Sequence, residues 1–335
     1  MPLRLGYKAS AEQFGPRELL DFSILAEKLG FDSVFVSDHF QPWRHTGGHA
    51  PFSVAWLGAL GERTSRVLIG TSVLSPSFRY HPAIVAQAFA TLGVLFPDRV
   101  ILGMGTGESM NETPATGMPW PPQKERTQRF RESLALIERL WCDERVSFSG
   151  EFYRTSKATI YDRPNKKVPI YVAGAGPVMA KLAGERAEGF ICTSGKDRDL
   201  YTKTLLPNFM AGLEKAGRAP DSVDRMIEMK VSFDSEKKRA LEDTRNWGAL
   251  ALSQQEKHDV EDAVEMERLA DALPVERTSS RWIVSDDAEE HVEKVKDYID
   301  MGFNHLVFHA PGTNQARFLK LYSERVLPLI RGRFG

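Results

Sequence analysis

The sequence predicts a closed (β/α)8 TIM barrel with insertions, and three observations support this fold class. Short runs rich in Val and Ile alternate with longer helical patterns along almost the whole chain, which is typical of parallel βα units. Eight strand candidates can be placed, and the first five lead into clear helical patterns. This count favours a barrel over an open doubly wound sheet. Dividing 335 residues by eight gives about 42 per unit, more than a minimal barrel needs, so insertions are expected.

The first half of the chain supplies four strands and the helices between them. Strands are expected at residues 3–7, 33–37, 67–73 and 100–104, where β-branched and other apolar residues are dense. Helices are expected at residues 16–29, 52–63 and 81–95. Pro16 suits the first turn of its helix and Gly30 its end, while Pro97 ends the third helix.

The second half is less regular. An amphipathic helix is expected at residues 124–141, and a hairpin follows at 146–148 and 152–153, joined through Gly150. Further strands are expected at 168–173, 190–193, 226–233 and 306–309, with helices at 288–301 and 315–330. No repeat or flexible linker marks a boundary. We therefore expect one domain over residues 1–335, with insertions near 109–124, 145–165 and 234–285.

Composition excludes several classes of protein. The chain has 44 Lys and Arg against 45 Asp and Glu, interspersed, so nothing suggests a nucleic-acid partner. It has neither 18 consecutive apolar residues nor an apolar leader at the amino terminus, so we expect no membrane partner and a cytoplasmic location. Its two cysteines, Cys142 and Cys192, lack the spacing of metal ligands, and we expect both to be buried.

Reactive side chains follow most of the strands. In a barrel the active site lies at the carboxyl ends of the strands, so these residues should meet on one rim. After the second to the sixth strand they are Ser37, Asp38 and His39; Ser72, Val73 and Ser75; Thr106, Gly107 and Glu108; Gly174, Ala175 and Gly176; and Thr193 and Lys196.

Asp38 and His39 are the first candidates for chemistry. Histidine exchanges protons near neutral pH, and a neighbouring carboxylate can bind a polar ligand. The alternative is that His39 only packs against the following loop. A metal site built from Asp38, His39, His45 and His49 is a further alternative, but their spacing matches no common site, and we expect no metal.

A glycine-rich turn follows the fourth strand. Its spacing, G-x-G-x-G over residues 103–107, differs from the G-x-G-x-x-G of a dinucleotide site and leads into the breaker-rich stretch 114–122. The Rossmann interpretation therefore fails. Glu108 remains as a carboxylate at the rim, either a proton carrier or a solvated loop residue.

A second glycine turn places Pro177 at the start of a helix, whose free amides would favour an anion. Lys196, Lys257 and Arg281 could add positive charge and clamp a phosphoryl group. For Lys257 the alternative is an exposed helix face.

At these residues the chain resembles the F420-dependent glucose-6-phosphate dehydrogenases of actinobacteria, within the luciferase-like superfamily of barrel oxidoreductases. The similarity covers nearly the whole chain. It is densest in segments 6–14, 36–45 (VSDHFQPWRH), 47–52, 70–74, 189–196 and 304–312. Long matching strings of this kind are more specific than a single glycine motif.

The resemblance implies a barrel that binds coenzyme F420, an 8-hydroxy-5-deazaflavin. Such an enzyme transfers a hydride from C1 of glucose 6-phosphate to C5 of F420, giving 6-phosphogluconolactone and reduced F420. The resemblance also implies a homodimer and a non-proline cis peptide at Ser72–Val73. His39 and Glu108 are implied as the acid/base pair with Trp43 beside them, and we expect Glu108 to accept and His39 to donate the proton.

The remaining implied site residues bind the cofactor or the substrate. For the cofactor they are Asp38, Ser72, Val73, Ser75, Thr106, Gly107, Asn111, Ala175, Gly176, Val178 and Met179. For the substrate phosphate they are Thr193, Lys196, Lys257 and Arg281.

Several positions depart from the family pattern: Ser75, Ser109, Met110 and residues 173–176 differ from the usual residues. These changes leave the phosphate clamp intact, so mannose 6-phosphate and fructose 6-phosphate stay open beside glucose 6-phosphate. Two other functions stay open as well. One is an FMN-dependent luciferase-like monooxygenase or reductase, and the other is a carrier that binds F420 without turnover.

Overall fold

Eight parallel strands close into a barrel in the computed structural model, which describes residues 2–257 and 260–335. Around the barrel the order is β1-β2-β3-β4-β7-β8-β9-β11, and β11 pairs with β1 to complete the circle. The strands are β1 (Arg4–Ala9), β2 (Ser33–Val36), β3 (Leu68–Thr71), β4 (Val100–Met104), β7 (Ile170–Ala173), β8 (Gly189–Thr193), β9 (Asp224–Phe233) and β11 (His305–His309). The predicted fold class is confirmed.

Helices surround this barrel. They are α1 (Pro16–Lys28), α2 (Ser53–Arg63), α3 (Pro82–Leu95), α4 (Ser109–Thr116), α5 (Gln123–Cys142), α6 (Pro177–Arg186), α7 (Leu206–Lys215), α8 (Lys237–Asp243), α9 (Ala263–Asp271), α10 (Val275–Ser279), α11 (Ala288–Asp300), α12 (Gln315–Arg325) and α13 (Leu327–Phe334). A π-helical turn, η1 (Leu200–Leu205), precedes α7, and a 3-10 segment, η2 (Thr244–Ala251), follows α8. Among the described residues, no helix combines the length and apolar character needed to cross a membrane.

The barrel interior is apolar at its middle level. Six side chains, each from a different strand, form this layer: Phe35, Ile101, Tyr171, Ile191, Met226 and Val307. Side chains alternate between the two faces of a strand, so the residue two positions further along points into the barrel as well. Thr193, Glu228 and His309 thus reach the open end above this layer.

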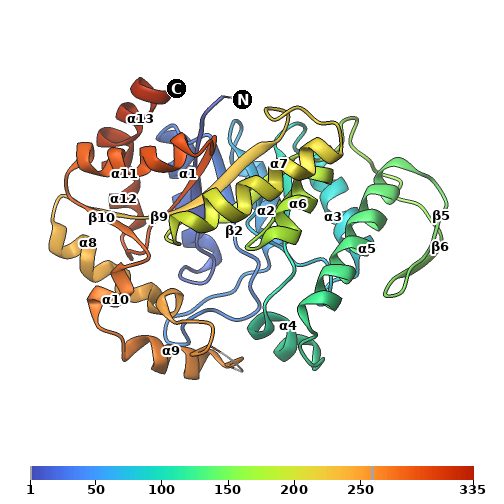
Figure 1. Cartoon of the computed structure of the whole chain (residues 1–335), viewed down its shortest axis with the longest axis horizontal. Coiled ribbons are helices and arrows are strands. Elements are labelled where there is room, and N and C mark those ends of the chain that lie inside the picture. Colours follow the sequence, from blue (N-terminus) through green and yellow to red (C-terminus); the bar gives the residue numbers. More distant parts are fainter. Residues whose placement is uncertain (1, 258–259) are drawn as a thin grey trace.

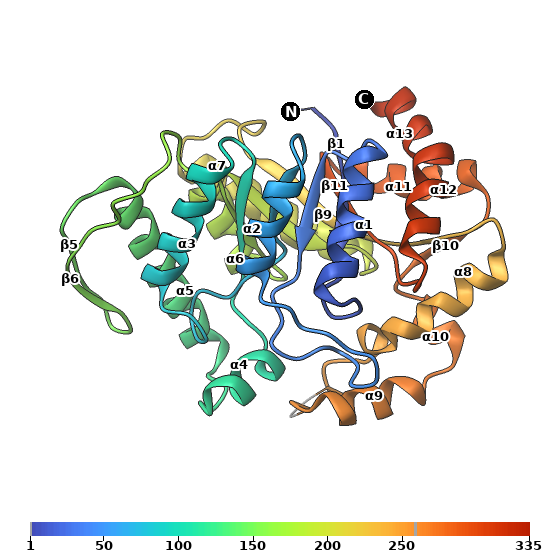
Figure 2. The same ribbon diagram turned by 180° about the vertical axis from the view of Figure 1, so that it is seen from behind.

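The two ends of the barrel are built differently. Figure 1 shows both chain termini at one end and α4, α9 and α10 at the other. Figure 2, from behind, shows the long connection between β2 and α2 reaching toward α9 and α10. The carboxyl ends of the strands therefore open into a space that these added segments surround.

Each expected insertion region contains structure of its own. The hairpin β5 (Val146–Ser149) and β6 (Arg154–Ala158) stands out at the side of the molecule (Figure 1). The segment after β9 forms α8, η2, α9, α10 and a short strand, β10 (Ile283–Ser285), which pairs with β9 outside the barrel.

Some local features differ from the sequence expectations or add to them. Residues 109–116, in an expected insertion, form α4; Pro114 inside it removes a single intrahelical bond, and Gly117, at φ 68°, ends the helix by donating to Thr113. The closing helix is two helices, α12 and α13, since Pro328 has no N–H to continue the first. Cys192 is buried as expected, but Cys142 is exposed at the end of α5.

Candidate functional site

A cavity of about 440 Å³ opens at the carboxyl ends of the barrel strands. It gathers residues that were expected at the site from segments far apart in the chain. These are Asp38, His39, Trp43, Ser72, Val73, Ser75, Thr106, Gly107, Glu108, Asn111, Ala175, Thr193, Lys196, Lys257 and Arg281. Gly176, Val178 and Met179 lie at the start of α6 and do not line it; Val178 faces outward and Met179 packs into the core.

Asp38 is buried and its carboxylate is fully engaged by neighbouring residues. Ser53 Oγ donates to its Oδ1 at 2.6 Å, and Arg79 Nη2 donates to its Oδ2 at 2.9 Å. Tyr80 OH also donates to the carboxylate, at 3.0 Å and 3.1 Å. Arg79 continues to Glu112 at 3.2 Å. Asp38 therefore fixes the start of the loop that carries His39.

Asn111 has a similar internal role on the other side of this loop. Its side-chain Oδ1 accepts hydrogen bonds from the backbone N–H of Phe40 at 2.8 Å and of Gln41 at 3.2 Å. Gln41 Nε2 in turn donates to the Met110 carbonyl at 3.0 Å. The start of α4 thus holds the loop after β2 in place.

His39 lies between two carboxylates. Its Nε2 is 3.4 Å from Glu12 Oε1 and 3.8 Å from Glu108 Oε2. Nδ1 lies 3.2 Å from the Gln41 carbonyl, which can only accept, so Nδ1 carries a proton there. The Nε2 position is then the one that faces the cavity and the two carboxylates. The Trp43 ring packs against the imidazole, with centroids 5.6 Å apart.

Glu12 was not expected at the site from the sequence. Burial alone would raise the pKa of Glu12, but His39, Lys8 and the Ser37 hydroxyl together lower it below its ordinary value. Glu12 is therefore a charged, buried partner of His39, whereas the Glu108 side chain is half exposed to the cavity.

Three cations, Lys196, Lys257 and Arg281, also line the cavity. Lys257 Nζ lies 5.2 Å from the centroid of the Trp43 ring, so the cluster extends to the residue that packs on His39. Burial, followed by the charges of Arg281, Lys257 and Lys230, lowers the pKa of Lys196 to about 8. Like charges crowded in this way repel one another. Such a cluster is stabilised when an anion occupies the space between them.

The loop after β8 carries Lys196, and its backbone is held close to the segment that carries Arg281. Tyr201 OH donates to the Thr193 carbonyl at 2.8 Å and accepts from the Lys196 N–H at 3.2 Å. Gly195 has φ 73°, and a Cβ there would lie 2.3 Å from the Arg281 carbonyl oxygen. Only glycine allows this close approach of the two segments.

The glycine turn after β4 forms another part of the cavity wall. Gly107 has φ 80°, and a Cβ there would lie 2.9 Å from Ser75 Oγ. Ser75 Oγ is buried and has no hydrogen-bond partner among the described residues. The peptide bond between Ser72 and Val73 is cis, as the resemblance implies. Ser75 thus offers a free hydroxyl to a ligand in this part of the cavity.

The cavity also contains charged residues that the sequence reasoning missed. They come from β1, the segment after it, β9 and β11: Lys8, Glu12, Glu228, Lys230 and His309. A signal was present, because Glu228 and Lys230 interrupt an otherwise apolar strand candidate near its carboxyl end. Charged residues are rarely buried without a partner or a role.

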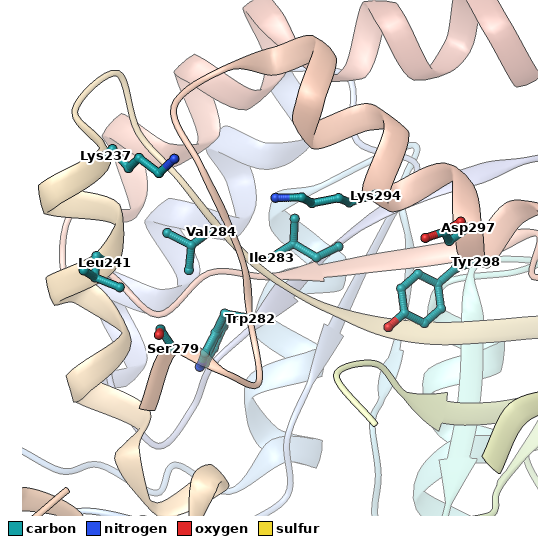
Figure 3. Close-up of a pocket in the computed structure, with 9 residues that line it drawn as sticks. All are labelled: Lys237, Leu241, Ser279, Trp282, Ile283, Val284, Lys294, Asp297 and Tyr298. Atoms are coloured by element: carbon teal, nitrogen blue, oxygen red, sulfur yellow. The ribbon is translucent and has the colours of Figure 1, made fainter. Parts of the chain in front are cut away.

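A second cavity of about 450 Å³ lies on the outer surface between α8, β10 and α11. Figure 3 shows the amino groups of Lys237 and Lys294 facing each other across a floor that includes Ile283 and Val284. Lys294 is paired with Glu290 at 2.6 Å, and Asp297 adds a further negative charge. Acid/base pairs like those at the barrel rim do not line this groove, so the rim cavity is the candidate site.

No group of three or more His, Cys, Asp or Glu side chains within residues 2–257 and 260–335 is arranged to hold a metal ion. His39 and Asp38 are instead engaged with other side chains. His258 lies outside the described residues.

Comparison with known proteins gives a consistent result. Residues 1–305 match the family of luciferase-like monooxygenases. A protein of Nakamurella multipartita is 62% identical over 334 residues, covering 100% of this chain and 98% of its own length. One from Beutenbergia cavernae is 64% identical, covering 99% and 98%. Both are named F420-dependent glucose-6-phosphate dehydrogenase.

Solved structures agree on the fold. An F420-dependent secondary alcohol dehydrogenase in complex with an F420-acetone adduct superposes with a TM-score of 0.92 at 33% identity, covering 97% of this chain and 98% of its own. The coenzyme F420 dependent tetrahydromethanopterin reductase from Methanopyrus kandleri gives 0.82 at 20% identity, covering 98% and 99%.

Proposed function

Because the chain belongs to the luciferase-like monooxygenase family and, within it, to the F420-dependent glucose-6-phosphate dehydrogenases, we propose that it is an enzyme that oxidises glucose 6-phosphate at C1 with coenzyme F420. The product is 6-phosphogluconolactone. The observation that carries this proposal is one cavity lined both by an acid/base pair and by a cluster of three cations.

The residues of the rim fit the cofactor. The Ser75 hydroxyl and the Gly107 turn lie close to one another and can form hydrogen bonds to a ligand, and the amino terminus of α6 suits an anionic group. When bound, F420 supplies a deazaflavin C5 that accepts the hydride from C1. Two sets of residues would hold F420. The first acts by contact or by fixing the loops around the cofactor: Asp38, Ser72, Val73, Thr106, Asn111 and Ala175. The second would contribute through its backbone: Gly176, Val178 and Met179.

The cation cluster holds the substrate phosphate in this proposal. Lys196, Lys257 and Arg281 supply charge, and Thr193 supplies a hydroxyl beside them. A phosphate dianion relieves the repulsion among the three cations and so binds strongly for its size. This role agrees with the clamp expected from the sequence.

His39, Glu108 and Trp43 serve the reacting end of the sugar. The C1 hydroxyl must lose a proton as hydride leaves C1, and Glu108 reaches into the cavity as the acceptor. His39, oriented by Gln41 and Glu12, is the proton donor toward the cofactor side. Trp43 packs on the imidazole and limits its rotation.

The deciding experiment mixes the purified protein with oxidised F420 and a panel of glucose, mannose and fructose 6-phosphates. The deazaflavin absorbance should bleach, fastest with glucose 6-phosphate. If no hexose 6-phosphate causes bleaching, the dehydrogenase proposal fails. Tighter binding of FMN than of F420 would favour the monooxygenase or reductase alternative, and F420 binding without turnover would favour a carrier.

We further propose that the whole chain is one domain, that it works in the cytoplasm and that it forms a homodimer. The single domain is supported by the pairing of β1 with β11, which joins the two ends of the chain. The homodimer is supported by α3, which has no charged residue between Pro82 and Leu95 and exposes Ile84, Val94 and Leu95. An exposed apolar face of this kind is typical of a protein interface.

A further inference from the structure

Two charged side chains of β9 are buried inside the barrel. Met226 belongs to the apolar layer of the interior, and Glu228 and Lys230 follow it on the same face of the strand. Their exposed fractions are 8% and 3%. Burial of a charge costs free energy unless it is well paired, so their presence in the cavity wall needs a physical reason.

The two charges belong to a compact network. Lys230 Nζ lies 3.1 Å from Glu228 Oε1, and Lys8 Nζ lies 3.3 Å from Glu228 Oε2. Burial alone would raise the pKa of Glu228, but Lys8, Lys230 and His309 hold it well below its ordinary value. Glu228 is therefore a carboxylate, which can only accept hydrogen bonds, and it is paired with two lysines; burial lowers the pKa of one of them, Lys230.

His309 adds an unsatisfied polar group to this network. Its ring is held between Trp247 and Trp282, at centroid distances of 4.4 Å and 5.0 Å, and is 2% exposed. Nδ1 faces Glu228 Oε1 at 3.4 Å, whereas Nε2 has no hydrogen-bond partner within the described part of the chain. A buried polar atom without a partner is rare in folded proteins, and His309 lines the cavity. This points to a ligand that supplies the partner.

The position of the network around the barrel identifies that ligand. Going round the rim, the strand order is β8, β9, β11, β1, β2. Thr193 and Lys196 of the phosphate clamp lie at the end of β8 and after it, Lys257 and Arg281 follow β9, and the catalytic His39 follows β2. Glu228, Lys230 and His309, on β9 and β11, thus lie between the two. A hexose 6-phosphate with its phosphate at the clamp and C1 at His39 must pass its ring over them.

We propose that Glu228, Lys230 and His309 form the sugar-ring subsite, which binds neighbouring hydroxyls of the hexose and selects its stereochemistry. The inference rests on the proposed function and adds the specificity determinant to it. Each hydroxyl both donates and accepts. A carboxylate that accepts, beside an ammonium group that donates, therefore matches a pair of adjacent ring hydroxyls, and His309 supplies a third polar group.

The test compares wild type and Glu228→Gln with glucose 6-phosphate and its 2-, 3- and 4-deoxy analogues, measuring kcat/KM with F420. In the wild type, removal of a recognised hydroxyl should lower kcat/KM roughly tenfold or more, because the site's buried polar groups lose their partner. In Glu228→Gln, kcat/KM for glucose 6-phosphate should be lower by a similar factor. The further loss of kcat/KM on going to that deoxy sugar should shrink to less than about threefold. The Kd of F420 should stay unchanged.

A structural role gives a different pattern. If Glu228→Gln lowers kcat/KM for all four sugar phosphates by the same factor, or weakens F420 binding, the subsite assignment is overturned. Thermal unfolding monitors folding of each variant. Should loss of the Glu228 charge prevent folding, Lys230→Gln is measured in the same way, because it lowers the buried positive charge. Asp297→Asn, in the outer groove, is the matched control and should leave discrimination unchanged.

Calorimetric titration of the same four sugar phosphates separates this inference from the dehydrogenase proposal. If the wild type does not reduce F420 but its Kd shows the deoxy penalty, and Glu228→Gln abolishes that penalty, the subsite stands and the proposed reaction falls. If turnover is present and neither Kd nor kcat/KM depends on a ring hydroxyl, the reaction stands and the subsite falls.

Discussion

At the scale of single residues, chemistry in this protein depends on charged groups that are oriented by others. Asp38 and Asn111 hold the loop after β2, and that loop presents His39 to Glu12 and Glu108. The proposed phosphate site is built in the same way, since Tyr201 shapes the loop that carries Lys196. Substitutions of the groups that face the cavity should therefore affect binding and turnover separately.

Lys196→Ala should raise the KM for glucose 6-phosphate about tenfold to a hundredfold, because a hydrogen bond to a charged group contributes about 1.5–3 kcal/mol. The Kd of F420 should change little, since Lys196 follows β8 and Ser75 follows β3, with β4 and β7 between them in the barrel. Steady-state kinetics and a fluorescence titration measure the two quantities. An unchanged KM would remove Lys196 from the clamp.

The pH dependence gives an independent check on the same residue. Burial and neighbouring cations lower the pKa of Lys196 to about 8 in the free protein. Below that pH the amine is charged and binds phosphate, and above it the charge is lost, so KM should rise as pH increases through about 8. Lys196→Arg, which stays charged at these pH values, should flatten the rise; an identical rise would assign it to another group.

Glu108→Gln should lower kcat roughly a hundredfold or more while leaving F420 binding intact, because the amide has the shape of the carboxylate but cannot accept the C1 proton. Stopped-flow measurement of deazaflavin bleaching isolates the chemical step. Turnover close to wild type would exclude Glu108 as the proton acceptor.

At the scale of elements, a side-chain carboxylate joins one helix of the barrel to a loop that leads into a strand. Glu27, near the end of α1, accepts hydrogen bonds from the backbone N–H groups of Ser65, Arg66 and Val67 before β3. Burial alone would raise the pKa of Glu27, but these three N–H groups lower it below its ordinary value. The carboxylate therefore joins α1 to the connection between α2 and β3.

Glu27→Gln should lower the free energy of unfolding by about 1–3 kcal/mol at pH 7, since the amide cannot accept all three hydrogen bonds. The pKa of Glu27 is lower in the folded state, so its stabilisation is present above the unfolded pKa of about 4.3 and is lost as pH falls below it. Urea unfolding at pH 7 and pH 4 should show the difference between variant and wild type shrinking at the lower pH. Glu62→Gln, on the exposed face of α2, is the control.

At the scale of the whole molecule, the outer face of α3 exposes large apolar side chains to solvent. Ile84 and Leu95 are 58% and 60% exposed on a helix without charge. A protein with this face should associate until it is covered.

Leu95→Glu should convert a dimer into a monomer, because it places a charge on the apolar face of α3 that the proposed interface covers. Light scattering coupled to size-exclusion chromatography measures the mass. Val264→Glu, at an apolar position on α9 that is 51% exposed, should leave the mass unchanged. A wild-type protein that elutes as a monomer at all concentrations would contradict the homodimer.

Much of this organisation could be predicted from the sequence by itself. The alternation of apolar strands and helices determined the barrel, and the residues that follow each strand determined most of the rim, because both are local properties of a repeating βα chain. Asp38, His39, Glu108 and Lys196 were found in this way. The resemblance added the cofactor and the substrate.

Only the tertiary structure decided the rest. Lys8, Glu228 and His309 meet at the cavity because barrel closure brings β1, β9 and β11 side by side, although Lys8 and Glu228 are 220 positions apart in the chain. Strand register determines which residues share a level, and register depends on how eight strands close rather than on the pattern within one strand. For the same reason the contact between Glu12 and His39 depends on the pairing of β1 with β2, which brings together the segments that follow these two strands.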